Sequence, residues 1–151
     1  MPNIRLSIKA VIIENDRLLV LKNRDDDGDW YMLPGGGQEH GETVPAALRR
    51  ECLEEIGSDV TVGRLCFVRD YIARHHEFAA VDGGTHQVEL MFECRMLSAP
   101  KMGTNPDSMQ TDVVWLDLAV LPEYRLYPSP LRRLLQHGLS AGETTYLGDV
   151  N

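Results

Sequence analysis

Three glutamates, Glu51, Glu54 and Glu55, lie within one turn of a predicted helix. Spacings of three and four residues place their side chains on one face of that helix. The arrangement does not favour the helix itself, because like charges at these spacings repel one another and anions at the carboxyl end oppose the helix dipole. Concentrated carboxylate oxygens instead suit a hard divalent cation such as Mg²⁺, which keeps open positions for water and phosphate.

The helix that carries these glutamates is predicted to begin near Thr43 and to end at Ile56. Thr43 is a favourable N-cap, and Pro45 lies in the first turn, where its missing N–H costs little. Gly57 suits the position just past the carboxyl end. The helix is therefore delimited at both ends, and the three carboxylates fall in its last two turns.

Strand patterns precede and follow this helix, and they predict a mixed sheet flanked by helices within a single domain. We expect that domain to cover residues 1–139 and residues 140–151 to form a loose C-terminal tail. The predicted strands cover residues 4–13, 17–22, 30–33, 61–73, 86–97 and 111–116; the loops cover 23–29, 74–85 and 98–110; a helical turn covers 117–121 and a terminal helix covers 129–137.

The segment from Gly36 to Ser58 resembles the Nudix box, G-x5-E-x7-R-E-U-x-E-E-x-G-U, in which U is an aliphatic residue. The two U positions hold Cys52 and Ser58, which depart from the pattern and concern packing rather than chemistry. The WYMLPGG sequence before the box and Trp115-Leu116 also resemble the family. Every fixed position of the box is present, as Gly36, Glu42, Arg50, Glu51, Glu54, Glu55 and Gly57.

The resemblance implies a Nudix fold, an α/β/α sandwich with a central mixed sheet. It also implies hydrolysis of a diphosphate linkage in a nucleoside diphosphate derivative, with Mg²⁺ or Mn²⁺ as cofactor. Nucleoside triphosphates, nucleotide sugars, ADP-ribose and dinucleoside polyphosphates are the substrate classes, and nucleoside triphosphates or related diphosphate derivatives rank first. Two alternatives remain: a non-catalytic nucleotide-binding regulator with this fold, and an RNA 5′-end pyrophosphohydrolase.

The same resemblance assigns roles within the box. Glu51, Glu54 and Glu55 are expected to ligate the metal together with the carbonyl of Gly36, and Glu51 or Glu54 is the general base. Arg50 is expected to donate a bidentate pair to one of these carboxylates and to hold its rotamer. Family members often add an acid from outside the box, for which the candidates are Glu77, Glu89, Glu93 and Asp112.

Substrate-binding residues are less sharply indicated. Lys22 and Arg24 follow the second strand and suit phosphate, although solvated charges are equally consistent with their positions. Trp30 suits stacking on a base, with core packing as the alternative. Arg74 and His75 form a basic spot that could contact phosphate, and a surface loop is the alternative.

The bulk composition narrows the partners and the compartment. The 151 residues carry a net charge of −8, which argues against general nucleic-acid binding or binding to anionic membranes. No segment resembles a signal peptide or a membrane span. Three cysteines without a CxxC pair indicate reduced thiols and a cytoplasmic protein. The expected partner is a small nucleotide, and the family resemblance allows a homodimer.

Overall fold

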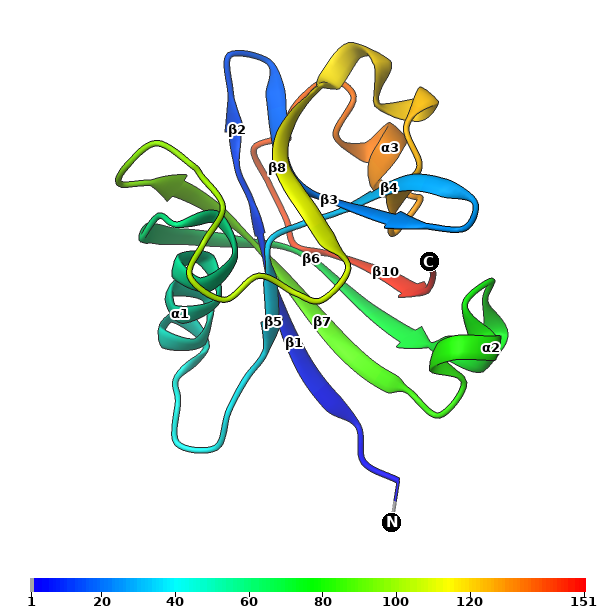
Figure 1. Cartoon of the computed structure of the whole chain (residues 1–151). Coiled ribbons are helices and arrows are strands. Elements are labelled where there is room, and N and C mark those ends of the chain that lie inside the picture. The colour runs from blue at the N-terminus through cyan, green and yellow to red at the C-terminus, as the bar shows by residue number, and fades with distance from the viewer. Residues whose placement is uncertain (1) are drawn as a thin grey trace.

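The computed structural model describes residues 2–151 and has two five-stranded sheets with helices on either side (Figure 1). The first sheet has the order β10-β6-β7-β1-β5. It is mixed, because β1 runs parallel to β7 and antiparallel to β5, while β6 runs antiparallel to β7 and parallel to β10. Its strands are β1 (Arg5–Val11), β5 (Gly35–Gly37), β6 (Val60–Ile72), β7 (His86–Met96) and β10 (Thr145–Asp149).

The second sheet has the order β2-β3-β4-β9, and β8 pairs with the other side of β3. Asn15 and Asp16 connect β2 to β3 with positive φ angles of 52° and 57°. These are the angles of a tight turn whose twist matches a β-hairpin, and both residue types tolerate them. The strands are β2 (Ile13–Glu14), β3 (Arg17–Asp25), β4 (Gly28–Met32), β8 (Gln110–Asp117) and β9 (Leu126–Tyr127).

Helix α1 (Val44–Ile56) confirms the predicted helix and both of its ends. The Thr43 side chain accepts a hydrogen bond from the backbone N–H of Ala46 at 3.3 Å. Gly57 ends the helix in the left-handed conformation, with φ of 63°. The helix buries an apolar stripe against β1, β5 and β6, and Glu55 is buried together with that stripe.

Two apolar clusters hold the layers together. One lies between α1, the first sheet and β3, and includes Leu48, Cys52 and Leu21. The other lies between the two sheets and the short helices near the C-terminus, and includes Val20, Met91 and Leu131. No helix among residues 2–151 is long and apolar enough to cross a membrane.

Several elements differ from the prediction. The acidic segment 23–29 is a continuation of β3 and β4 around a tight turn, and the predicted loop 74–85 contains the short helices η1 (Ala73–His75) and α2 (Ala79–Asp82). The helical turn near residue 117 is η2 (Leu118–Glu123). The terminal helix is limited to α3 (Leu131–Leu134), because the following hydrogen bonds span three residues rather than four.

The expectation of a loose tail at 140–151 is wrong, because this segment contains β10, which extends the first sheet beside β6. The hydroxyl of Thr144 donates to the carbonyl of Leu65 at 2.6 Å, and that of Tyr146 donates to Asp70 at 2.6 Å. The pairing partner lies some eighty residues away in the chain. A five-residue strand with mostly polar neighbours gives too short a pattern to be recognised locally.

Asp149 fastens the end of β10 to the segment that follows β6. Its carboxylate oxygens lie 2.7 Å from His75 Nδ1 and 2.7 Å from His76 Nε2, and one of them accepts from the N–H of Ile72 at 3.0 Å. Burial acts to raise the pKa of Asp149, but these hydrogen bonds outweigh it and hold the pKa well below the usual range.

We predict that Asp149→Ala lowers the free energy of unfolding by about 1.5–3 kcal/mol, because it removes hydrogen bonds to a charged group. A carboxyl with a lowered folded-state pKa contributes stability that is complete above its unfolded pKa of about 3.9 and is lost as the pH falls below it. Urea unfolding at pH 7 and at lower pH measures both effects. Asp26→Ala, at the exposed hairpin tip, is the control and should change little; an equal loss in both variants would contradict the assignment.

Candidate active site

Arg50 lies beside the glutamates of α1. We call the side of the helix that carries Glu51, Glu54 and Glu55 the carboxylate face. The guanidinium of Arg50 donates a bidentate pair to Glu42 at 2.8 and 3.0 Å. It also donates to Glu51 at 3.0 Å, to Glu54 at 3.5 Å and to the carbonyl of Gly37 at 3.0 Å. The sequence predicted the bidentate pair for one of the three helix glutamates, and this is wrong: the pair goes to Glu42, while Glu51 and Glu54 each receive a single bond.

Glu42 thereby organises the loop that leads into α1. One of its oxygens accepts from the backbone N–H of Glu39 at 2.9 Å. The hydrogen bonds from Arg50 and from this N–H lower the pKa of Glu42. The carboxylate is consequently ionised at neutral pH and anchors Arg50, which in turn orients the glutamates of the helix.

Glu51 packs against the backbone of Gly36 in β5. A Cβ atom at Gly36 would lie 2.6 Å from the carboxyl carbon of Glu51, which is closer than real Cβ atoms approach other atoms. The Glu51 side chain is only 14 % exposed. Burial raises the pKa of Glu51 and the bond from Arg50 opposes this rise. A side chain at position 36 would therefore displace the Glu51 carboxylate from its present position.

Glu55 is buried, at 1 % exposure. Its Oε1 accepts from the N–H of Gly35 at 2.7 Å, and its Oε2 has no hydrogen-bond partner among the described residues. Burial raises the pKa of Glu55 to about 9, with Lys9 opposing the rise and Asp107 adding to it. A buried carboxyl oxygen without a donor is costly unless a proton or a cation occupies the position beside it.

Asp107 lies outside the box and was not among the acids that the sequence proposed. Its side chain acts on Glu55 through a hydrogen bond and through its charge, and both raise the pKa of Glu55. The loop before β8 is held there by hydrogen bonds to the end of α1, including Lys101 N–H to Ile56 O at 2.9 Å and Asn105 N–H to Glu54 O at 3.0 Å. Nothing in the local sequence signals these contacts.

The acids that the sequence did propose have other partners. Glu89 is buried in an ion pair with Arg69 at 3.0 Å. Asp112 accepts from the N–H of the next residue, Val113, and Glu77 accepts from the side chain of Asn151. Glu93 borders a separate surface depression beside β2.

The three helix glutamates do not converge on one point. Among residues 2–151 no group of three or more His, Cys, Asp or Glu side chains is arranged to hold a metal ion. Arg50 is bonded to both Glu51 and Glu54, while Glu55 turns towards Gly35. The donor set nevertheless fits a hard cation chemically, because it supplies oxygen atoms and includes the buried Oε2 of Glu55, which has no hydrogen-bond partner among the described residues.

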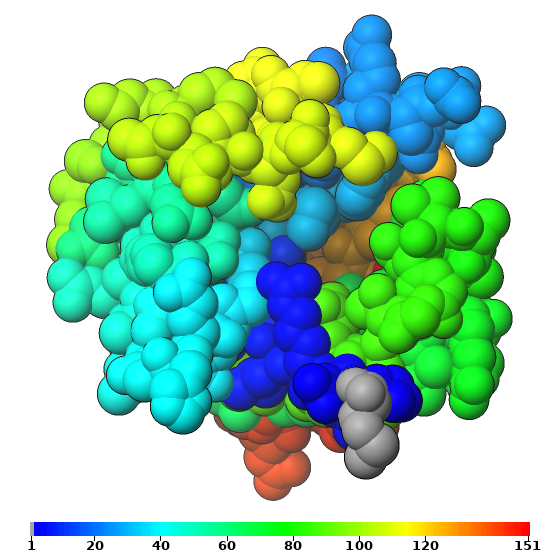
Figure 2. All heavy atoms as spheres, turned by 60° about the horizontal axis from the view of Figure 1, so that its bottom comes forward, coloured from blue at the N-terminus to red at the C-terminus, as the bar shows by residue number. Residues whose placement is uncertain are grey.

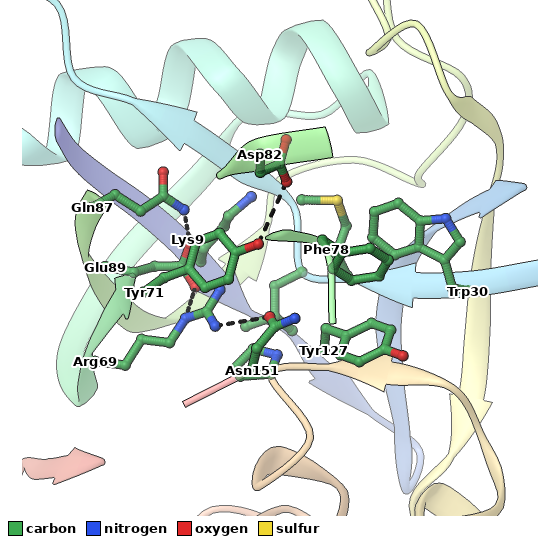
Figure 3. Close-up of a pocket in the computed structure, with 13 residues that line it drawn as sticks. Lys9, Trp30, Arg69, Tyr71, Phe78, Asp82, Gln87, Glu89, Tyr127 and Asn151 are labelled. Carbon is green, nitrogen blue, oxygen red and sulfur yellow. Dashed lines mark hydrogen bonds and ion pairs between the residues drawn. The ribbon is translucent and has the colours of Figure 1, made fainter. Parts of the chain in front are cut away.

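A cavity of about 140 Å³ lies between the two sheets. Figure 2 shows the hollow beside the segment around α2, with later residues at its floor. One end of the cavity is aromatic: the ring of Phe78 lies 5.6 Å from that of Trp30 and 5.2 Å from that of Tyr127. Figure 3 shows these three rings together on one side of the pocket. Such a cluster suits a flat heterocycle.

The opposite end of the cavity is polar. Arg69 donates to Glu89 at 3.0 Å and to the side-chain oxygen of Asn151 at 3.1 Å. Gln87 donates to the other oxygen of Glu89 at 3.4 Å. Lys9 also lines the cavity (Figure 3). Its ammonium donates to the carbonyl of Gly35 in β5 at 3.2 Å. The pocket is thus joined through one strand to the carboxylate face.

The predicted substrate residues divide into two groups. Trp30 lines the pocket and packs against Phe78 and Tyr127, and its stacking on a base stays a prediction. Lys22 and Arg24 instead pair with Asp29 across the β3–β4 hairpin, at 3.3 and 2.8 Å. Arg74 and His75 lie on the surface after β6, where His75 binds Asp149. Neither pair lines the cavity between the sheets.

A sequence model of the NUDIX domain matches residues 4–137. The chain belongs to the NUDIX family. It is 34 % identical over 143 residues to a protein of Enterobacter sp. (strain 638) named nucleoside triphosphatase NudI, covering 89 % of this chain and 97 % of that one. It is 32 % identical over 133 residues to human 8-oxo-dGDP phosphatase NUDT18, covering 86 % of this chain and 36 % of that one.

Solved structures agree with the family assignment. The crystal structure of a MutT NUDIX hydrolase from Burkholderia pseudomallei has a TM-score of 0.66 at 25 % identity and covers 91 % of this chain and 99 % of that one. The solution structure of the E. coli ORF135 protein has a TM-score of 0.69 at 19 % identity and covers 89 % and 90 %. The predicted Nudix fold is confirmed, and the protein is a hydrolase of pyrophosphate bonds in nucleotide derivatives.

We predict that Gly36→Ala lowers kcat/KM about 100-fold while the protein remains folded, because the new methyl group displaces the Glu51 carboxylate and a misplacement of about 1 Å in an active site can cost that much. Steady-state kinetics on a hydrolysed nucleotide, with circular dichroism as the fold check, test this.

Gly37→Ala is the matched control in the same strand. A Cβ atom there would meet only the flexible end of the Arg5 side chain, so most activity should be retained. Equal losses in the two variants would contradict the role of Gly36.

Proposed function

We propose that this Nudix hydrolase cleaves a nucleoside triphosphate in the presence of Mg²⁺ or Mn²⁺. The observation that carries the proposal is the connection between pocket and carboxylates: Lys9 donates to the carbonyl of Gly35, and the N–H of the same residue donates to Glu55. A base in the aromatic end would extend its phosphates along β5 towards α1. The name of the Enterobacter relative, a nucleoside triphosphatase, supports the same substrate class.

We assign the cation to Glu54, Glu55 and the carbonyl of Gly36, with Asp107 as a further ligand. Glu55 supports this assignment most directly, because its buried Oε2 has no donor among the described residues. When bound, the ion neutralises charge on the diphosphate and lowers the pKa of the attacking water. This set omits Glu51, which the sequence analysis counted among the ligands.

We assign Glu51 as the general base, which accepts the proton of the attacking water. Its raised pKa brings it closer to neutrality, which improves a general base. Its bond from Arg50 and its packing against Gly36 hold the carboxylate in one position. Water attacks a phosphorus of the diphosphate, Glu51 accepts the proton, and the bond to the bridging oxygen breaks. Arg50 acts as a positioning residue, because its bonds go to carboxylates.

The two alternatives receive less support. An RNA end would need a basic groove, for which the exposed Arg74 and His75 are candidates, but His75 is already hydrogen-bonded to Asp149. A purely regulatory role is inconsistent with membership in a hydrolase family whose fixed box residues are all present. The homodimer implied by the family resemblance remains a prediction. A cytoplasmic location is supported by three buried cysteines that form no disulfide.

We predict that Glu51→Gln and Glu55→Gln abolish activity for different reasons. Glu51→Gln should lower kcat by 10²- to 10⁴-fold, the usual contribution of a general base, while Mn²⁺ binding stays within a few-fold of the wild type. Glu55→Gln should weaken Mn²⁺ binding, because a charged ligand becomes neutral. Electron paramagnetic resonance measures free Mn²⁺ directly.

Glu123→Gln, a change at an exposed residue of η2, is the control for both measurements. If Glu51→Gln lost the metal and Glu55→Gln kept it, the two assignments would be reversed.

We predict that Phe78→Ala raises KM for the preferred nucleoside triphosphate about tenfold, because stacking of a base on an aromatic ring contributes about 1–3 kcal/mol. The preferred substrate comes from a panel of nucleoside triphosphates, nucleotide sugars, ADP-ribose, dinucleoside polyphosphates and triphosphorylated RNA. Val81→Ala, an exposed residue of the same segment, is the matched control. An unchanged KM in Phe78→Ala would place the base elsewhere.

A further inference from the structure

Lys9 is a buried cation without a directly bound anion. The residue is 5 % exposed, and its ammonium donates one hydrogen bond, to the carbonyl of Gly35 at 3.2 Å. A lysine ammonium carries three donors. Among the ion pairs of residues 2–151 none includes Lys9. Two of its three donors therefore have no protein acceptor in the part of the chain that the structure describes.

This arrangement is unfavourable for the protein alone. Burial of a charge costs several kcal/mol unless an opposite charge and hydrogen bonds compensate. The other buried cation of the same cavity is compensated in this way, because Arg69 binds Glu89 at 3.0 Å. Lys9 has only the longer-range attraction of Glu51 and Glu55. The comparison within one cavity indicates that Lys9 lacks an anion that a ligand would supply.

The position of Lys9 identifies the kind of anion. The side chain lines the cavity that holds the aromatic cluster, and Figure 3 shows it between the polar side chains and the rings. The residue it binds, Gly35, also donates to Glu55. An anion at Lys9 would thus lie between a stacked base and the carboxylates of α1, which is the place of the first phosphate groups of a nucleotide.

We propose that Lys9 binds a non-bridging phosphate oxygen of the substrate, next to the nucleoside. This inference rests on the proposed function for the identity of the nucleotide. The ammonium fixes the phosphate chain at its inner end, so that the diphosphate linkage extends to Glu51. Lys9 is a substrate-binding residue that supplies positive charge from the opposite side to the carboxylate-bound cation.

A purely structural role for Lys9 makes a different prediction. If the ammonium only balanced the charges of Glu51 and Glu55, its removal would change stability and the environment of the carboxylates, without changing how strongly a phosphate group contributes to binding. The decisive quantity is therefore the ratio of two dissociation constants, for a nucleoside and for its 5′-monophosphate.

The experiment measures both constants by calorimetry in EDTA, so that no metal ion contributes. It uses the wild-type protein, Lys9→Gln, which removes the charge but keeps a polar N–H donor, and Lys9→Arg, which retains the charge. The wild type should bind the monophosphate at least about tenfold more tightly than the nucleoside, as expected for a charged hydrogen bond. Lys9→Gln should lose most of this preference, and Lys9→Arg should keep part of it.

Arg95→Met is the control, because it removes one exposed positive charge outside the cavity. An unchanged ratio in folded Lys9→Gln would overturn the proposal, as would absence of any monophosphate preference in the wild type. If Lys9→Gln does not fold, the proposal is tested by the preference for the monophosphate over the nucleoside in the wild type and in Lys9→Arg. The binding measurements need no turnover. A wild type that hydrolyses no nucleoside triphosphate would therefore refute the proposed function, whereas the ratio of dissociation constants would still test the role of Lys9.

Discussion

The buried carboxyl group of Glu55 is the constraint around which the site is arranged. It joins the end of α1 to β5 through the N–H of Gly35, inside a contact that is otherwise apolar. An isolated carboxylate at this depth would be costly, and its pKa of about 9 reflects that cost. The group can be ionised only when positive charge lies beside it, so the most buried acid of the helix is also the one that most strongly favours a bound cation.

The other carboxylates near Arg50 also lack enough positive charge to balance them. One guanidinium, that of Arg50, bonds to Glu42, Glu51 and Glu54. A single positive charge does not compensate three negative ones, and a phosphorylated substrate brings more negative charge. Arg50 can therefore fix the geometry of the glutamates while leaving a deficit of positive charge. A divalent ion on one side and Lys9 on the other are suited to fill this deficit.

The sequence predicted those parts of the site that a local pattern determines. Thr43, Gly57 and the spacing of the glutamates specify α1, and the structure reproduces its ends. Asp107 was not predictable, because it reaches Glu55 through backbone hydrogen bonds between a loop and the end of α1. The strand β10 was missed for the same reason, since its pairing with β6 connects segments far apart in the chain. Such contacts between distant segments cannot be predicted from the local sequence.

The pocket and the carboxylates are built in different ways. The rings at the aromatic end of the pocket come from three separate segments: Trp30 from β4, Phe78 from the turn before α2, and Tyr127 from β9. Only Trp30 was identifiable from sequence, through its place before the box. The carboxylates instead come mainly from one helix with fixed spacing. An aromatic wall assembled from several segments can change one residue at a time, whereas any change in the register of α1 would displace all the carboxylates together.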